Sequence, residues 1–166
     1  MEDRHLSENF TLFQLTRTDH ADLQKENRKV THTEYSKLSV CAELLEQCRQ
    51  VLGMELDVHS GRRCLALNRR VGSTDKSQHL KCEAVDFSPA GPDDEASVNA
   101  AFFRILAATR QGYPKFGQFI AESQKTAREG RKYWLHISLG PGYRDAAKCG
   151  EVLTMRDGKY TVVANV

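Results

Sequence analysis

Two long stretches of the chain repeat apolar residues at the spacing of an amphipathic α-helix. Within residues 35–52 the apolar positions are Leu38, Cys41, Ala42, Leu44, Leu45, Cys48 and Leu52. Within residues 95–112 they are Val98, Ala101, Phe102, Ile105 and Leu106. Residues three and four apart share one face of a helix, and glycines mark the ends at Gly53 and Gly112. The pattern predicts two main helices, each with one face that must be buried.

Six shorter stretches alternate apolar and polar residues or are rich in β-branched and aromatic residues, as strands are. They cover residues 54–60, 84–87, 116–122, 133–138, 151–155 and 160–164. The Asp157-Gly158 pair between the last two is a strong signal for a hairpin turn. The combination predicts an α+β domain in which the two helices pack on one face of an antiparallel sheet. Residues 1–166 are expected to form a single domain, because this length suits one hydrophobic core.

Two polar stretches between these elements predict loops. Residues 22–33 are dominated by Lys, Arg, Glu and Asn, which predicts a loop with no chemistry of its own. Residues 123–132 are highly charged and predict an exposed hairpin connection, which beside an active site can touch substrate.

The composition excludes several classes of function. The net charge is +2, and Lys and Arg are scattered among Asp and Glu, so there is no basic stripe for a nucleic-acid backbone. No run approaches the roughly 18 apolar residues of a membrane span. The first nine residues lack the apolar core of a signal peptide, which predicts a protein made in the cytoplasm. Five cysteines without CxxC spacing predict reduced thiols, not a disulfide framework.

The candidate chemistry lies in residues 77–87. His79 and Asp86 are both good zinc ligands, and strand alternation places Asp86 on the face opposite Val85 and Phe87. Catalytic zinc usually takes three protein ligands and leaves one position to water. His136, inside the strand predicted over residues 133–138, is the candidate for the third ligand. Taken alone, a His and an Asp seven residues apart are more often a surface polar contact than a metal site.

The flanking residues add a resemblance. The chain resembles the zinc D-Ala-D-Ala carboxypeptidase family of cell-wall peptidases, in particular its small phage-type members, over about residues 10–139. The family pattern runs S-G-x-R, an Asn, a Gly-Ser turn, S-x-H-x-x-G-x-A-x-D and W-x-H. The matching positions are Ser60, Gly61, Arg63, Asn68, Gly72, Ser77, His79, Ala84, Asp86, Trp134 and His136. The resemblance implies a hedgehog/DD-peptidase-like fold with one zinc ion in a cleft on the sheet face opposite the helices, and a peptidoglycan peptide as substrate.

Further roles follow from the chemistry of such a site. A general base must take the proton of the attacking water, and Glu122 is our candidate because it closes the strand predicted to pair with that of His136. Glu129 is closer to His136 in sequence but sits in the charged connection. The Arg63 guanidinium suits a substrate carboxylate or an oxyanion. Ser77 can bind substrate or the second ring nitrogen of a ligand histidine.

Cys82 departs from the pattern, because it stands where the family has glycine. If the backbone there has a positive φ, a side chain costs about 1 kcal/mol or more. The thiol can also be a fourth zinc ligand, which would close the site and make it structural. The third reading is a small buried substitute that the backbone tolerates.

Two classes of function follow. One is a zinc metallopeptidase, a monomer that hydrolyses a D-amino-acid-containing bond of peptidoglycan as a carboxypeptidase or an endopeptidase. The other is a noncatalytic zinc-containing module that binds the wall or forms part of a virion. Because no signal peptide is recognised, we expect either to reach the wall by another route, such as phage lysis, a virion or an accessory secretion machine.

Overall fold

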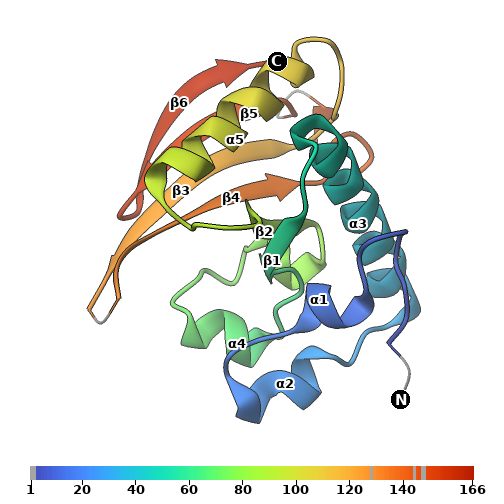
Figure 1. Ribbon diagram of the computed structural model, residues 1–166. Helices are drawn as coiled ribbons and strands as arrows, with labels where there is room; N and C mark the ends of the chain where they lie inside the picture. The colour runs from blue at the N-terminus through green and yellow to red at the C-terminus, as the bar shows by residue number, and fades with distance from the viewer. Residues whose placement is uncertain (1–2, 128, 144, 147–148) are drawn as a thin grey trace.

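The protein folds into a six-stranded sheet covered by helices (Figure 1). The structure is a computed structural model that describes residues 3–127, 129–143, 145–146 and 149–166. The helices are α1 (Leu12–Thr16), α2 (Ala21–Asn27), α3 (His32–Leu52), α4 (Leu65–Arg70), α5 (Glu95–Thr109) and the short 3₁₀ helix η1 (Gln78–Lys81). The strands are β1 (Leu56–Ser60), β2 (Ala84–Pro89), β3 (Gln118–Thr126), β4 (Gly130–Ser138), β5 (Glu151–Arg156) and β6 (Lys159–Asn165). The predicted α+β class is confirmed.

The sheet is mixed, which corrects the expectation of a purely antiparallel one. The strand order is β1-β2-β4-β3-β5-β6, and every neighbouring pair is antiparallel except β3 and β5, which are parallel. Strand β4 is paired on both sides, with β2 and with β3. The chain that leaves β4 therefore crosses over and pairs β5 with the other side of β3. Alternation along a strand does not reveal which neighbour it will pair with, and the parallel pair was therefore missed.

The two main helices share the apolar core on one face of the sheet. α5 contacts β2, β3 and β4, while α3 packs against α5 and β2 (Figure 1). The strand side chains that join this core include Val85, Phe87, Phe119, Leu135 and Ile137, all fully buried. Strand residues alternate between faces. Asp86 and His136, which are neighbours in sequence of these apolar residues, therefore point to the opposite face.

Helix α3 begins and ends where its sequence provides caps. The Thr31 side chain accepts a hydrogen bond from the backbone of Glu34, whose carboxylate bonds back to Thr31, and this capping box starts the helix before the predicted residue 35. Gly53 ends it in the left-handed conformation with φ 66°. None of the helices in the described part of the chain is both long and apolar enough to cross a membrane.

Two predicted loops are in fact regular structure. Most of residues 22–33 belongs to α2 and the start of α3; α2 buries only Asn27, so it has no apolar stripe for the periodicity to detect. The charged connection predicted over residues 123–132 is largely strand, because β3 runs to Thr126 and β4 starts at Gly130.

Candidate metal centre

The site is assembled where β2 and β4 lie side by side. Asp86 and His136 are direct partners in the antiparallel register, so their side chains lie next to each other on the same face. His79 comes from η1, which ends just before β2 and packs against it. The segment η1 and the strands β2 and β4 thus bring together the three candidate ligands that the sequence suggested.

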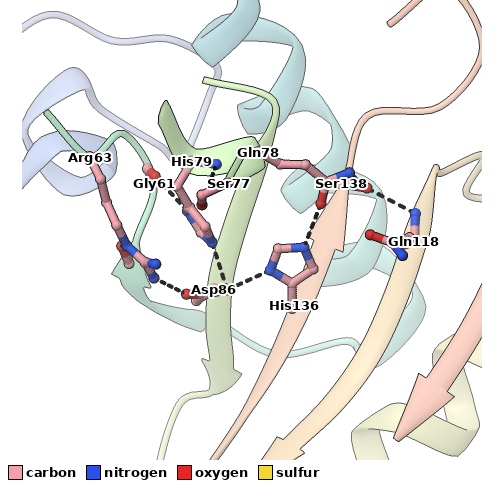
Figure 2. A network of polar contacts seen from close by, with 10 residues as sticks. Gly61, Arg63, Ser77, Gln78, His79, Asp86, Gln118, His136 and Ser138 are labelled. Atoms are coloured by element: carbon pink, nitrogen blue, oxygen red, sulfur yellow. Dashed lines mark hydrogen bonds and ion pairs between the residues drawn. The ribbon is translucent and has the colours of Figure 1, made fainter. Parts of the chain in front are cut away.

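The three side chains converge on one carboxylate oxygen (Figure 2). Nδ1 of His136 lies 2.8 Å from Oδ1 of Asp86, and Nε2 of His79 lies 3.2 Å from the same oxygen. All three residues are buried, and one potential ligand atom from each lies within 4.8 Å of the others. The cluster is thus compact enough to hold one metal ion.

The outer nitrogen of each imidazole is held by a carbonyl oxygen. Nδ1 of His79 lies 2.7 Å from the backbone oxygen of Gly61, and Nε2 of His136 lies 3.1 Å from Oε1 of Gln78 (Figure 2). A carbonyl oxygen only accepts, so these outer nitrogens carry the protons. The inner nitrogens are left to face Asp86. Metal-ligating histidines are typically oriented in this way by an acceptor on the far nitrogen.

The electrostatics of the cluster favour a cation at its centre. Burial lowers the pKa of His79, which favours its neutral form. Burial opposes ionisation of Asp86, but the charge and the hydrogen bonds that the His79 and His136 rings offer when their inner nitrogens are protonated hold its pKa well below the usual range. A neutral imidazole nitrogen and an ionised carboxylate both present lone pairs to each other, and a metal ion between them satisfies both. Two imidazoles and one carboxylate are a donor set that zinc uses in catalytic sites, so the residues present fit a zinc ion.

Arg63 lies in the site and is bonded to the candidate ligand Asp86. Its Nη2 donates to Oδ2 of Asp86 at 2.6 Å, and its Nε donates to Oγ of Ser60 at 2.8 Å. The ion pair occupies the second carboxylate oxygen and leaves Oδ1 turned toward the two imidazoles. Arg63 also lines the cleft, where its remaining guanidinium donors are near any bound molecule.

Ser77 and Gln78 position the two histidines. Oγ of Ser77 accepts a hydrogen bond from the backbone N–H of His79 at 3.3 Å and caps η1. Gln78, which holds His136, in turn donates through Nε2 to Oγ of Ser138 at 3.1 Å. That hydroxyl also accepts from the backbone N–H of Gln118 at 2.8 Å. Sequence reasoning missed Gln78, since its place between Ser77 and His79 was the sole signal.

Glu122 lines the same cleft as the three ligand candidates. It lies on β3 beside Trp134 of β4, and its side chain is half-buried. Burial raises the pKa of Glu122 to about 7, and the Asp86 charge adds to the rise, while His136 and Arg63 oppose it. Glu129 is exposed at the β3–β4 turn and is not among the cleft-lining residues.

Cys82 belongs to the core and not to the cluster. It adopts the left-handed conformation with φ 57°, it is fully buried, and burial raises the pKa of its thiol to about 12. It packs within the helix-side core, where the Cys41 thiol donates to its carbonyl oxygen at 3.6 Å. Among the described residues, the candidate ligand group contains His79, Asp86 and His136 and no cysteine. The geometry favours a buried substitute for glycine over a fourth ligand.

Gly61 and Asn27 hold the loop that carries Arg63. A Cβ atom at Gly61 would lie 2.4 Å from the Leu15 carbonyl oxygen, so only glycine fits there. The Asn27 amide donates to the carbonyls of Thr16 and Arg62, and its oxygen accepts from the backbone N–H of Cys64. Asn27 therefore supports the site, although its sequence segment predicted a loop without chemistry.

A buried cluster of two imidazoles and a carboxylate, opening on a cleft that an acid also lines, is the arrangement typical of metal-dependent hydrolases. The chain belongs to the Peptidase M15 family, whose model matches residues 14–121. This finding confirms the resemblance to the zinc D-Ala-D-Ala carboxypeptidase family and indicates a metal-dependent peptidase. The matched region includes Arg63, His79 and Asp86, and ends before Glu122 and His136. A search of curated proteins gave no significant match.

Proposed function

We propose that this protein is a zinc metallopeptidase that hydrolyses a D-amino-acid-containing peptide bond of peptidoglycan, as a carboxypeptidase or an endopeptidase. The observation that carries the proposal is the buried cluster of His79, Asp86 and His136, with both outer ring nitrogens bonded to carbonyl oxygens, in the cleft that Glu122 lines.

His79, Asp86 and His136 would hold the zinc ion through Nε2, Oδ1 and Nδ1, the atoms that face one another. When bound, zinc supplies Lewis acidity that activates water and polarises the scissile carbonyl. Gly61 and Gln78 fix the ring orientations, and Arg63 keeps the second oxygen of Asp86 away from the centre.

Glu122 is the general base in this proposal. A base is most effective when its pKa lies near the working pH, and burial places the pKa of Glu122 at about 7. Its carboxylate would take the proton of the attacking water and deliver it to the leaving amine. The half-buried position gives water and substrate access from the cleft.

Arg63 and Ser77 would contact the substrate. Ser60 and Asp86 each accept one of the five guanidinium N–H donors of Arg63, and further donors suit a carboxylate or the oxyanion of the tetrahedral intermediate. Ser77 lines the cleft next to His79, where its hydroxyl can bond to the peptide.

The catalytic reading is preferred to a noncatalytic wall-binding module. One of the two grounds for the alternative was Cys82 as a closing fourth ligand, and it is weakened because that thiol lies in the core. We propose that the active form is a monomer that acts after being released or carried to the wall. The substrate in this proposal is the stem peptide, and we expect no nucleic-acid partner.

The test combines metal analysis with digestion of purified muropeptides. We expect about one zinc ion per chain, release of a D-amino acid or of a cleaved stem peptide, and loss of both properties in a His79→Ala/His136→Ala double variant. The matched control is His5→Ala/His32→Ala, which removes two exposed histidines. Full zinc retention in the first double variant would refute the ligand assignment, and intact muropeptides with fully loaded wild-type protein would refute the activity.

A further inference from the structure

The metal cluster continues into a row of apolar side chains that crosses the sheet. Asp86 pairs with His136, which pairs with Ile120, which pairs with Leu153, which pairs with Val162. Direct cross-strand partners place their side chains on the same face. The row thus leads from the metal ligands on β2 and β4, across β3 and β5, to the edge strand β6.

A second row lies beside the first. Trp134 pairs with Glu122, which pairs with Met155, which pairs with Tyr160. All members of both rows line one cleft of about 1290 Å³. The general-base candidate is therefore flanked, on the β5–β6 side, by apolar and aromatic side chains. We call Ile120, Leu153, Met155, Tyr160 and Val162 the cleft floor.

The cleft floor is apolar surface that the core does not use. Ile120, Leu153 and Met155 form a buried cluster separate from the helix-side core. Tyr160 and Val162 are 60% and 64% exposed, although they continue the same surface. Contiguous exposed apolar surface beside a catalytic cluster is typical of a binding site.

The opposite side of the metal cluster has a different character. Arg63, Lys76 and Lys81 line the cleft on the side of α4 and η1. Glu83 also lines this side, but its carboxylate is paired with Lys37 at 2.6 Å. A peptide crossing the cluster therefore meets cationic groups at one end, which suit a terminal carboxylate, and apolar groups at the other.

We propose that the cleft floor is the substrate subsite for the peptide segment that precedes the scissile bond, and that it selects uncharged side chains with aliphatic groups. The inference rests on the proposed peptidase function. Strands are spaced about 4.8 Å apart, so the distance from β4 to β6 is about 14 Å, enough for about four extended residues. The carboxylate-bearing side of the substrate then lies toward Arg63, which fixes the direction of the peptide.

The test compares Val162→Lys with Val163→Lys. Val163 is on the same strand and is 43% exposed, but it does not line the cleft, so it is the matched control. Substrates are two peptides with the same scissile bond, one with alanine and one with glutamate in the segment before it. We expect the wild type to prefer the alanine peptide by about tenfold or more in kcat/KM, because the floor offers a glutamate no cationic partner and lies beside the Glu122 carboxyl group.

In Val162→Lys this preference should shrink by about tenfold, through a higher KM for alanine and a lower KM for glutamate, with kcat unchanged. Val163→Lys should behave as wild type. Equal preferences in the two variants would overturn the inference while leaving the peptidase function standing.

A binding measurement keeps the two failures separate. An uncleavable analogue of the alanine peptide, titrated into zinc-loaded protein, should shift the methyl NMR signals of Val162 and not those of Val163. Shifts at Val162 without cleavage of any peptide would contradict the proposed function alone. Cleavage without shifts at Val162 would contradict the cleft floor alone.

Discussion

Glu122 makes the metal-free protein sensitive to pH in a predictable direction. Burial raises its pKa from 4.5 to about 7, so the folded state favours the protonated form. For a raised pKa, the stabilisation is fully present below the unfolded value and is lost as pH rises through the folded one. The rise corresponds to at most about 3 kcal/mol, reduced by solvent screening because the side chain is half-buried. The unfolding free energy should therefore fall as the pH rises from about 4.5 to about 7.

The assay is urea unfolding of chelator-treated protein at pH 5 and pH 8, for wild type and Glu122→Gln. Glutamine cannot ionise, so the variant should gain about 1 to 3 kcal/mol of unfolding free energy relative to wild type between the two pH values. Glu129→Gln is the matched control, because it removes a carboxylate from an exposed turn. Parallel pH profiles for wild type and Glu122→Gln would refute the inferred environment of Glu122.

The same substitution tests the catalytic role once zinc is restored. Loss of the base should lower kcat by about 10²-fold or more while zinc stays bound, because Glu122 is not among the ligand candidates. An active Glu122→Gln beside an inactive Glu129→Gln would transfer the role to Glu129.

Three further substitutions probe the supporting structure. Gln78→Leu removes the oxygen that accepts from His136 and should weaken zinc binding by about 10- to 100-fold in chelator competition. The control is Gln124→Leu, which changes an exposed amide in the same cleft. Equal zinc affinities of the two variants would contradict the role of Gln78 in orienting His136. Cys82→Gly should leave zinc affinity unchanged and keep the unfolding free energy within about 1 kcal/mol of the wild-type value, because relief of the left-handed backbone offsets the lost thiol packing. A sulfur neighbour of zinc in X-ray absorption of the wild type would overturn this prediction. Gly61→Ala should cost about 1 to 3 kcal/mol in denaturant unfolding through the 2.4 Å approach to the Leu15 carbonyl, and wild-type stability would show that the loop can yield.

The ligand candidates were proposed from strand alternation around Asp86 together with the resemblance in the flanking motifs. Alternation in β2 separates Asp86 from Val85 and Phe87, and the same rule in β4 separates His136 from Leu135 and Ile137. The structure brings the two polar positions together because apolar neighbours on both strands need the same helix-covered face. Glu122 was predicted to close a strand over residues 116–122, but β3 continues to Thr126, so Glu122 lies in the middle of the strand beside Trp134.

The features that escaped prediction depend on pairings between distant segments. The parallel pair of β3 and β5 sets Leu153 beside Ile120 and so creates the cleft floor, and strand periodicity contains no information about that neighbour. Asn27 acts through backbone groups of Thr16, Arg62 and Cys64, which alternation does not register. Hydrogen bonds to backbone atoms leave little trace in a single sequence.

The candidate ligands are held by hydrogen bonds from other parts of the folded chain. His79 is fixed by a backbone oxygen in a loop that Asn27 ties to α1, and His136 is fixed by Gln78, which is bonded to Ser138. These supports belong to the folded chain and do not require the ion. Bringing Asp86 into a buried position is costly for a lone carboxylate, but Arg63 pairs with one of its oxygens. When both rings are neutral, the lone pairs of their inner nitrogens repel those of the other Asp86 oxygen. A bound cation would replace this repulsion by attraction. Ligands that hydrogen bonds within the chain hold in orientation lose less conformational freedom when they bind a divalent ion, which favours binding.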